Sequence, residues 1–566
     1  MDETEVRLAD LVASNPSLPR RAEAPVSDLR AQLVAMVGDG LADGAAAIAL
    51  EAHLSEVERL MRQIARRRPR GYWLHTIRRL SPPAPGAMSP AGALITRNVL
   101  LAAVMKYGSG EDDSGDSSEL FEDLGGCLRL REFTTEHALD LLTMNALATE
   151  YMRTASDYRR LGKGAVLATV GGWVSTPAQQ ETERLLQLYD YRLRERGDLL
   201  SNFGAAASTS AVGVGDVFST LTTPDLNVEA RPIPAELTQE HDRVQVNSPT
   251  YLPARWSIRP VRNLLRLFAN EVREAARLDA DELLGVVWAI AKRHEMLAAN
   301  NFDFCVQYVQ RGYFPSPRGR PLEGAIRHIA QGYQRYVEGT ERRTISANAA
   351  LGVVRRALAE MSYRADEFDN LVVIYQMPLK PMFTTVECVY FDLVAIPAYL
   401  QGVFQVVGAL TGTRGNEKGI RFHRDVIAAT NTRPGVVPWI CDRVLQTPGK
   451  RRDLDASFVA GNTLYLLECK ARVAGPRIYT GEYAAVKARW ELVQADLRKI
   501  EDLRWSLERN PVGPNYKVPT GVTKVEHCVC APQPEWIPST DPAYWLSPTT
   551  PRVCTVEEVF DHATAP

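Results

Sequence analysis

Two β-rich runs that meet at Gly461-Asn462 constrain the fold of this chain more than any other feature. Residues 451–460 precede this pair and residues 463–471 follow it, and both runs contain many residues that favour strands. Glycine at the first central position of a two-residue loop favours a type II′ turn, whose twist matches that of paired antiparallel strands. The segment therefore predicts a tight β-hairpin with a fixed register.

The predicted register brings charged side chains together. It places Asp455 opposite Glu468, and Asp453 opposite Lys470. Because side chains alternate across a strand, all four are expected to project from one face. Directly opposed Cβ atoms lie about 4.5–5.5 Å apart, so the two acids should be close neighbours.

Two carboxylates at this separation repel each other unless a cation lies between them. Mg²⁺ prefers one or two carboxylates together with waters and phosphate oxygens, at about 2.0–2.1 Å. A bound metal lowers the pKa of its water and neutralises phosphoryl oxygens. Lys470, beside Glu468, could orient that water or stabilise charge developing at phosphorus. The hairpin therefore predicts a site for phosphodiester hydrolysis.

The same residues could instead form a solvated charged face, with Lys470 in surface salt bridges to Asp453 and Glu468. The uninterrupted apolar run Leu464–Leu467 favours the functional interpretation, because such runs are typical of strands covered on both faces. The charges begin only where this run ends. Repulsion between the acids also predicts that Glu468→Gln unfolds no sooner than the wild-type protein without metal.

The 566-residue length predicts about three to four domains, or two large ones, and the net charge of −2 excludes a globally basic nucleic-acid coat protein. Helices are expected at about 24–67, 93–106, 132–200 with an interruption near Gly171-Gly172, 260–300, 322–340 and 345–361, and a strand at 370–376. The expected order after residue 411 is a helix at 417–430, three strands, a helix at 482–508, and strands at 524–531 and 552–559. The resulting division is a helical N-terminal region (1–202), an irregular linker or covering segment (203–255), a mainly helical middle region (256–410) and an α/β unit (411–566).

Within this order of elements, the pattern Asp455-x12-Glu468-x-Lys470 resembles the PD-(D/E)XK nuclease superfamily, which has the restriction-endonuclease-like fold. The resemblance covers about residues 411–566. It implies a nuclease dependent on Mg²⁺ or Mn²⁺, in which Asp455 and Glu468 bind the metal and Lys470 assists the attacking water.

The resemblance also implies further site residues. The family often adds an acid from the first helix and a polar residue from the helix after the motif. The candidates are the Cys469 backbone carbonyl as a metal ligand, Glu417 with Asp425 as second choice, and Gln494 and Lys487. Asp453 stays a competing ligand, because Leu454 rather than proline precedes Asp455.

Several arginines are candidates for binding nucleic acid. Arg472 and Arg477 follow the motif, so substrate at the site must pass them. Near the N-terminus, a cluster of cations directly precedes the rings of Tyr72 and Trp73, a mixture that suits phosphates and bases. These cations are Arg66, Arg67, Arg68 and Arg70. The alternative is a helix end whose arginines pair with acids.

We therefore expect a cytoplasmic, metal-dependent nuclease that favours DNA, in prokaryotic defence or DNA repair by analogy of architecture. The helical region is expected to select substrate, regulate the nuclease, or bind a protein partner or a second copy of the chain. Eight scattered cysteines favour a reducing compartment, and the uncharged run 393–410 is interpreted as a buried helix rather than a membrane span. The alternative is a catalytically silent fold of this kind in a binding scaffold.

Overall fold

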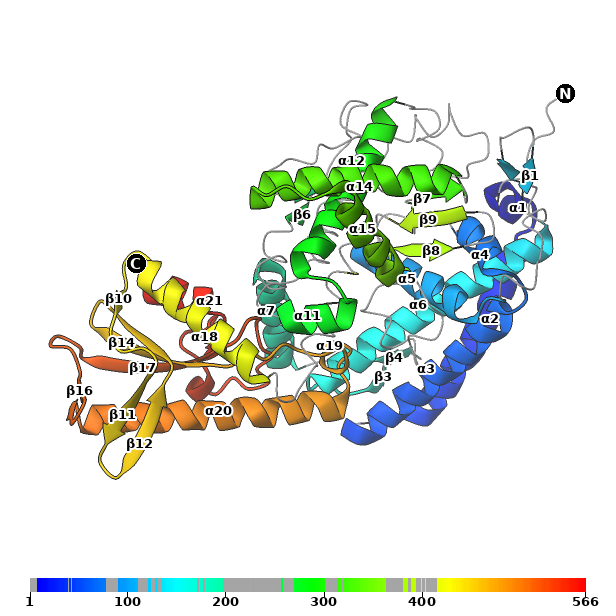
Figure 1. The fold of residues 1–566 in the computed structure, drawn as a ribbon. Coiled ribbons are helices and arrows are strands. Elements are labelled where there is room, and N and C mark those ends of the chain that lie inside the picture. Colours follow the sequence, from blue (N-terminus) through cyan, green and yellow to red (C-terminus); the bar gives the residue numbers. More distant parts are fainter. Residues whose placement is uncertain are drawn as a thin grey trace.

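The structure is a computed structural model of residues 1–566. It describes most of residues 8–196, residues 269–300, most of 313–362, short pieces of 380–403, all of 415–565, and, between 197 and 268, only 227–228 and 256–257. The predicted strand at 370–376, most of the predicted segment at 203–255 and most of the run at 393–410 therefore lie outside the described residues. The described part is mixed α/β, with helices dominating the N-terminal half and a sheet in the C-terminal unit (Figure 1).

The N-terminal helices pack around one long central helix. These helices are α1 (Leu8–Ser14), α2 (Ser17–Val37), α3 (Asp43–Ala65), α4 (Arg70–Ile77), α5 (Pro90–Tyr107), α6 (Thr135–Gly162) and α7 (Gln180–Arg196). The apolar faces of α3, α5 and α6 bury Leu54, Val104 and Leu147 against each other. The single helix expected at 24–67 is wrong, because the chain turns at Gly38, whose φ of +55° suits glycine.

The interruption expected near Gly171-Gly172 within the helical stretch 132–200 is confirmed. The short strands β3 (Ala168–Val170) and β4 (Trp173–Ser175) form a hairpin between α6 and α7. Two further pairs of short strands are β1 (Phe121–Asp123) with β2 (Leu128–Leu130), and β5 (Asn227–Val228) with β6 (Trp256–Ser257).

The middle region is a helical layer beside a small antiparallel sheet. Its helices are α11 (Ala269–Ala276), α12 (Ala280–Asn300), α14 (Arg320–Glu341) and α15 (Ala347–Met361). The sheet has the order β7-β9-β8, formed by β7 (Tyr313–Pro317), β9 (Cys388–Asp392) and β8 (Met382–Thr384). The helices expected at 322–340 and 345–361 are thus confirmed within a few residues.

The C-terminal unit is a five-stranded sheet with the order β10-β13-β14-β17-β18. Its strands are β10 (Val437–Pro438), β13 (Ala456–Ala460), β14 (Thr463–Cys469), β17 (Lys524–Cys530) and β18 (Val553–Cys554). The hairpin β13–β14 is antiparallel, whereas β14, β17 and β18 run parallel. The fold class is confirmed at this coarse level.

Helices cover both faces of this sheet. Helix α18 (Gly415–Thr432) packs through Phe422 on Phe458 and Leu467, whereas α20 (Tyr483–Arg509) packs through Val493 on Leu464. Because side chains alternate along a strand, the residue after Leu467 faces α20. This alternation directs Glu468 toward α20.

The structure confirms the predicted turn and most of the predicted register. Gly461 has φ +58°, as the first residue of a II′ turn requires, and pairs run from Ala456↔Leu467 to Ala460↔Thr463. The placement of Asp453 opposite Lys470 is wrong. Asp453 instead faces Val444, in a separate hairpin of β11 (Arg443–Thr447) and β12 (Lys450–Leu454).

This second hairpin forms because the chain changes direction at Asp455. The preceding residue, Leu454, is buried in the core between the sheet and α20. Its side chain holds β12 out of line with β13, so the long strand expected before the turn is divided in two. The remaining pair of strands, β15 (Val512–Gly513) and β16 (Tyr516–Lys517), follows α20.

The strand expected at 552–559 is mostly a helix. Only β18 is extended, and α21 (Val556–Ala563) begins directly after it. Thr555 caps α21 and exchanges hydrogen bonds with Glu558 in a capping box. A short helix, α19 (Pro476–Tyr479), and a 3-10 turn, η4 (Pro542–Tyr544), complete the unit. None of the helices that the structure describes is long and apolar enough to cross a membrane.

Candidate active site

Asp455 lies at the bend between β12 and β13 and is held by backbone contacts. Its carbonyl oxygen accepts hydrogen bonds from the Asp442 amide (2.8 Å) and from Nε2 of His423 on α18 (2.6 Å). Its carboxylate Oδ2 accepts a hydrogen bond from the Cys469 amide at 2.7 Å. Burial raises the pKa of Asp455, and the charge of Glu468 raises this pKa further. The two carboxylates are therefore electrostatic neighbours.

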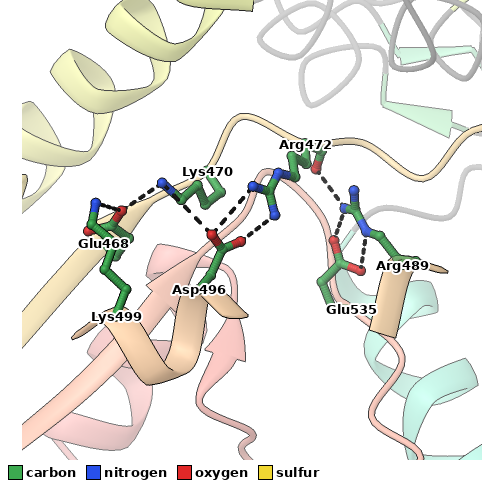
Figure 2. A network of polar contacts seen from close by, with 7 residues as sticks. All are labelled: Glu468, Lys470, Arg472, Arg489, Asp496, Lys499 and Glu535. Carbon is green, nitrogen blue, oxygen red and sulfur yellow. Dashed lines mark hydrogen bonds and ion pairs between the residues drawn. The ribbon is translucent and has the colours of Figure 1, made fainter. Parts of the chain in front are cut away.

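Glu468 is the most buried charged group of the site, with a side chain 2% exposed. Its Oε1 accepts hydrogen bonds from two ammonium groups, Lys470 Nζ at 2.6 Å and Lys499 Nζ at 2.7 Å (Figure 2). Its Oε2 is buried and accepts no hydrogen bond from any residue that the structure describes. One oxygen of this carboxylate therefore accepts two hydrogen bonds, whereas the other accepts none from the described residues.

The second ammonium comes from α20. Burial opposes the charge on Lys499, but the hydrogen bond to Glu468 and the negative charges of Glu468, Asp455 and Asp453 together outweigh burial and raise the pKa of Lys499 above its ordinary value. Its side chain remains 48% exposed, whereas that of Lys470 is 25% exposed. The site thus presents two positive groups on the side where solvent reaches it.

A second carboxylate on α20 extends the network. Asp496 Oδ1 lies 4.0 Å from Lys470 Nζ, and the Arg472 guanidinium donates two hydrogen bonds to the Asp496 carboxylate (Figure 2). Asp496 and Lys499 lie one helical turn apart, so both side chains reach the end of β14. Lys470 is therefore held between carboxylates from a strand and a helix.

The structure brings Asp455, Glu468 and Lys470 together, as the predicted register requires. The other predicted site residues behave differently. Cys469 contacts Asp455 through its amide, and the predicted role of its carbonyl stays a prediction. Glu417 belongs to α18, but its side chain lies outside what the structure describes. Asp425, on the same helix, is exposed.

The two residues expected from α20 point elsewhere. Gln494 donates a hydrogen bond to the Tyr544 hydroxyl at 3.2 Å, and Lys487 is exposed. Sequence reasoning missed Asp496, Lys499 and His423, which make the observed contacts. The signal for Asp496 and Lys499 was their three-residue spacing on a helix expected to cover the sheet. His423 gave no comparable signal, because a lone helical histidine is usually on the surface.

Most of the predicted nucleic-acid-binding arginines are already in ion pairs. Arg472 binds Asp496, and Arg477 binds Glu482 with two hydrogen bonds. Near the N-terminus, Arg67 donates a hydrogen bond to Asp140 at 2.6 Å. Arg68 lies 3.5 Å from Glu136 and 3.7 Å from Asp140, Arg66 is exposed, and the Nε of Arg70 is buried. Arg67 and Arg68 therefore pair with acids, which is the alternative to nucleic-acid binding stated for this helix end.

The donor set can be compared with the needs of a divalent ion. Within the described ranges, no three His, Cys, Asp or Glu side chains form a group that could hold a metal alone. Mg²⁺ requires only one or two carboxylates when waters and phosphate oxygens supply the rest. The buried Oε2 of Glu468 receives no hydrogen bond within the described part of the chain, and Asp455 is its neighbour, so the residues fit such an ion.

Comparison with known proteins gives no further assignment. No protein-family model, curated protein or solved structure matches the chain.

Proposed function

We propose that this protein is a metal-dependent nuclease whose active site consists of Asp455, Glu468 and Lys470, with Lys499 as an added member. The observation that carries the proposal is the Glu468 carboxylate, which is buried next to Asp455 and has one oxygen that no described residue supplies with a hydrogen bond. A cation is the natural partner for two such acids, and Mg²⁺ or Mn²⁺ suits carboxylate oxygens. Two nearby ammonium groups favour a negatively charged substrate.

Each residue has a distinct role in this proposal. Asp455 and Glu468 would hold the metal, which supplies charge neutralisation at the phosphate and an acidified water. Lys470 and Lys499 fix the orientation of Glu468 through its Oε1. Lys470 can also donate a hydrogen bond to the incoming water or to a phosphate oxygen, where negative charge increases during the reaction.

The remaining parts of the proposal concern substrate and setting. We propose nucleic acid as substrate, with DNA favoured, and a role of residues 1–410 in substrate selection, regulation or partner binding. A cytoplasmic place in prokaryotic defence or DNA repair fits this architecture by analogy. A second candidate is a silent nuclease-like domain in a binding scaffold, favoured by the two lysines that already neutralise Glu468.

Purified full-length protein should cut plasmid DNA or oligonucleotides in the presence of Mg²⁺ or Mn²⁺, and EDTA should stop the reaction. The variants Asp455→Asn, Glu468→Gln and Lys470→Met should each lower the rate at least about 100-fold, the scale of lost acid–base or charge stabilisation. Asp453→Asn is the matched control, because Asp453 is an exposed acid of the same segment that pairs with β11. Binding of DNA and RNA without cleavage under every metal condition would favour the scaffold.

A further inference from the structure

Helix α7 of the N-terminal region is anchored in the C-terminal unit by one buried arginine. The guanidinium of Arg192 donates hydrogen bonds to both oxygens of Glu558, at 2.6 and 3.2 Å. It also donates to the backbone carbonyls of Glu535 (3.1 Å) and Val553 (3.4 Å). Arg192 is therefore bonded at once to α21, to the end of β18 and to the segment that carries Glu535.

Apolar and aromatic contacts surround this anchor. Tyr189 of α7 meets Trp536 edge-to-face, with ring centroids 5.6 Å apart. Lys163, just past α6, lies over both rings, 4.3 Å from the centroid of Tyr189 and 5.5 Å from that of Trp536. The segment next to Glu535 is thus held between the helical region and the sheet, which limits where the Glu535 side chain can lie.

The Glu535 carboxylate continues the contacts toward the site. Arg489 of α20 donates two hydrogen bonds to it, the one from Nε at 3.0 Å. The same guanidinium donates to the backbone carbonyl of Arg472 at 3.4 Å. All three residues appear in Figure 2, in line with Asp496 and Lys470. Arg489 therefore fixes the backbone of the residue whose own side chain binds Asp496.

Asp496 is the last link. It receives the Arg472 side chain on one side and lies 4.0 Å from Lys470 Nζ on the other. A lysine side chain has four rotatable bonds, so a defined position for its ammonium requires partners that are themselves fixed. Asp496 is fixed by Arg472, Arg472 by Arg489, and Arg489 by Glu535. The first and last of these contacts are ion pairs that are at least half buried, where a displaced charge is costly, and the middle one is the hydrogen bond from Arg489 to the Arg472 backbone carbonyl.

We infer that the chain of ion pairs and backbone hydrogen bonds from Arg192 through Glu535, Arg489, Arg472 and Asp496 positions the Lys470 ammonium, which makes the helical region a working part of the C-terminal site. The effect on the rate of cleavage rests on the proposed function, but the positioning of the Lys470 ammonium does not. In this chain Arg489 and Glu535 are positioning residues, since neither reaches Glu468 or Asp455 in any contact that the structure gives for the described residues.

The test uses full-length protein with two conservative variants. Glu535→Gln keeps the shape of the side chain and the carbonyl that Arg192 binds, but removes the charge that holds Arg489. Arg489→Lys keeps the charge but loses the planar fork that reaches both Glu535 and Arg472. The matched control is Arg355→Gln, which cuts an exposed ion pair between Arg355 of α15 and Glu323 of α14, outside the chain of contacts that leads to Lys470.

Two readouts separate positioning from cleavage. The first is the rate at which acetic anhydride acylates Lys470, measured by mass spectrometry relative to the exposed lysines Lys450 and Lys487 of the same molecule. The second is kcat and KM for DNA cleavage with Mg²⁺. Both variants should raise the relative acylation of Lys470 and lower kcat by about 2- to 30-fold with little change in KM, the range found along coupled networks. The control should change neither value.

The outcomes are distinct. Unchanged acylation of Lys470 in both variants, with the fold intact by circular dichroism, would overturn the positioning inference even if the wild type cuts DNA. Changed acylation in a protein that cuts no nucleic acid would support the positioning while rejecting the proposed function. If Glu535→Gln unfolds, Arg489→Lys alone decides the matter.

Discussion

Glu468→Gln separates two opposite expectations about the site. Repulsion between paired acids predicts that the variant is as stable as the wild type without metal. The structure reverses this expectation, because Glu468 accepts charge-assisted hydrogen bonds from Lys470 and Lys499 at 2.6 and 2.7 Å. The neutral amide keeps the shape but loses the charge, so these two ammonium groups lose their common partner.

The size of the effect follows from the two bonds and their exposure. A hydrogen bond to a charged group contributes about 1.5–3 kcal/mol when buried. Both lysines are partly exposed, at 25% and 48%, and can turn toward water, so each bond is worth less than that range. Removing the charge of Glu468 also relieves its repulsion with Asp455, which offsets part of the stability lost with the two hydrogen bonds. We expect a net loss of about 1–3 kcal/mol in EDTA.

Hydrogen exchange is the suitable assay, because a chain with several regions does not unfold in one step. Amides of β14 should exchange about 5- to 150-fold faster in Glu468→Gln, which is the expected free energy expressed as an opening equilibrium. Glu482→Gln, which cuts the pair with Arg477, is the control and should leave β14 unchanged. Equal or slower exchange in Glu468→Gln would refute the reasoning and restore repulsion as the dominant effect.

Two further predictions concern stability away from the site. Burial, with smaller effects of nearby arginines, lowers the pKa of His527 to about 3. The unfolded chain therefore binds a proton first as the pH falls below about 6.5, and the fold loses stability. His527→Gln should lose about 3 kcal/mol less than the wild type between pH 7 and pH 4 in hydrogen exchange of the β17 amides, and equal losses would contradict this. A Cβ at Gly162 would overlap the backbone carbonyl of Gly481, so Gly162→Ala should destabilise the protein by about 1–3 kcal/mol in hydrogen exchange of the α6 amides, whereas Gly324→Ala, with open space around it, should not.

The hairpin at the site could be predicted because its determinants are local. Gly461 selects the turn, the turn fixes the register from Ala460↔Thr463 to Ala456↔Leu467, and Asp455 and Glu468 follow directly after this paired stretch as electrostatic neighbours. The prediction failed one residue beyond this pair. Burial of Leu454 bends the chain at Asp455 and sends Asp453 to another strand, which depends on packing against α20 rather than on the turn.

The sequence predicts that α20 is a helix, but it does not predict which of its side chains contact the site. Its limits differ from the expected ones by a single residue at each end, because its apolar spacing is regular. Which flank of the helix reaches β14 depends on how it is rotated on the sheet. A rotation that directs Val493 and Ile500 inward places Asp496 and Lys499 at the site and leaves Lys487 in solvent. Gln494 was therefore chosen on the correct helix but on the wrong side.

The contact between Arg192 and Glu558 joins residues 366 positions apart in the chain. A ribosome that adds about 5–20 residues per second needs roughly 20–70 seconds to cover that interval. During this time the apolar side of α7, which includes Leu185 and Tyr189, has no completed domain to cover it. Nascent chains should therefore depend on chaperones that bind this helix. The Lys470 ammonium can reach its fixed position only after residue 558 has been translated.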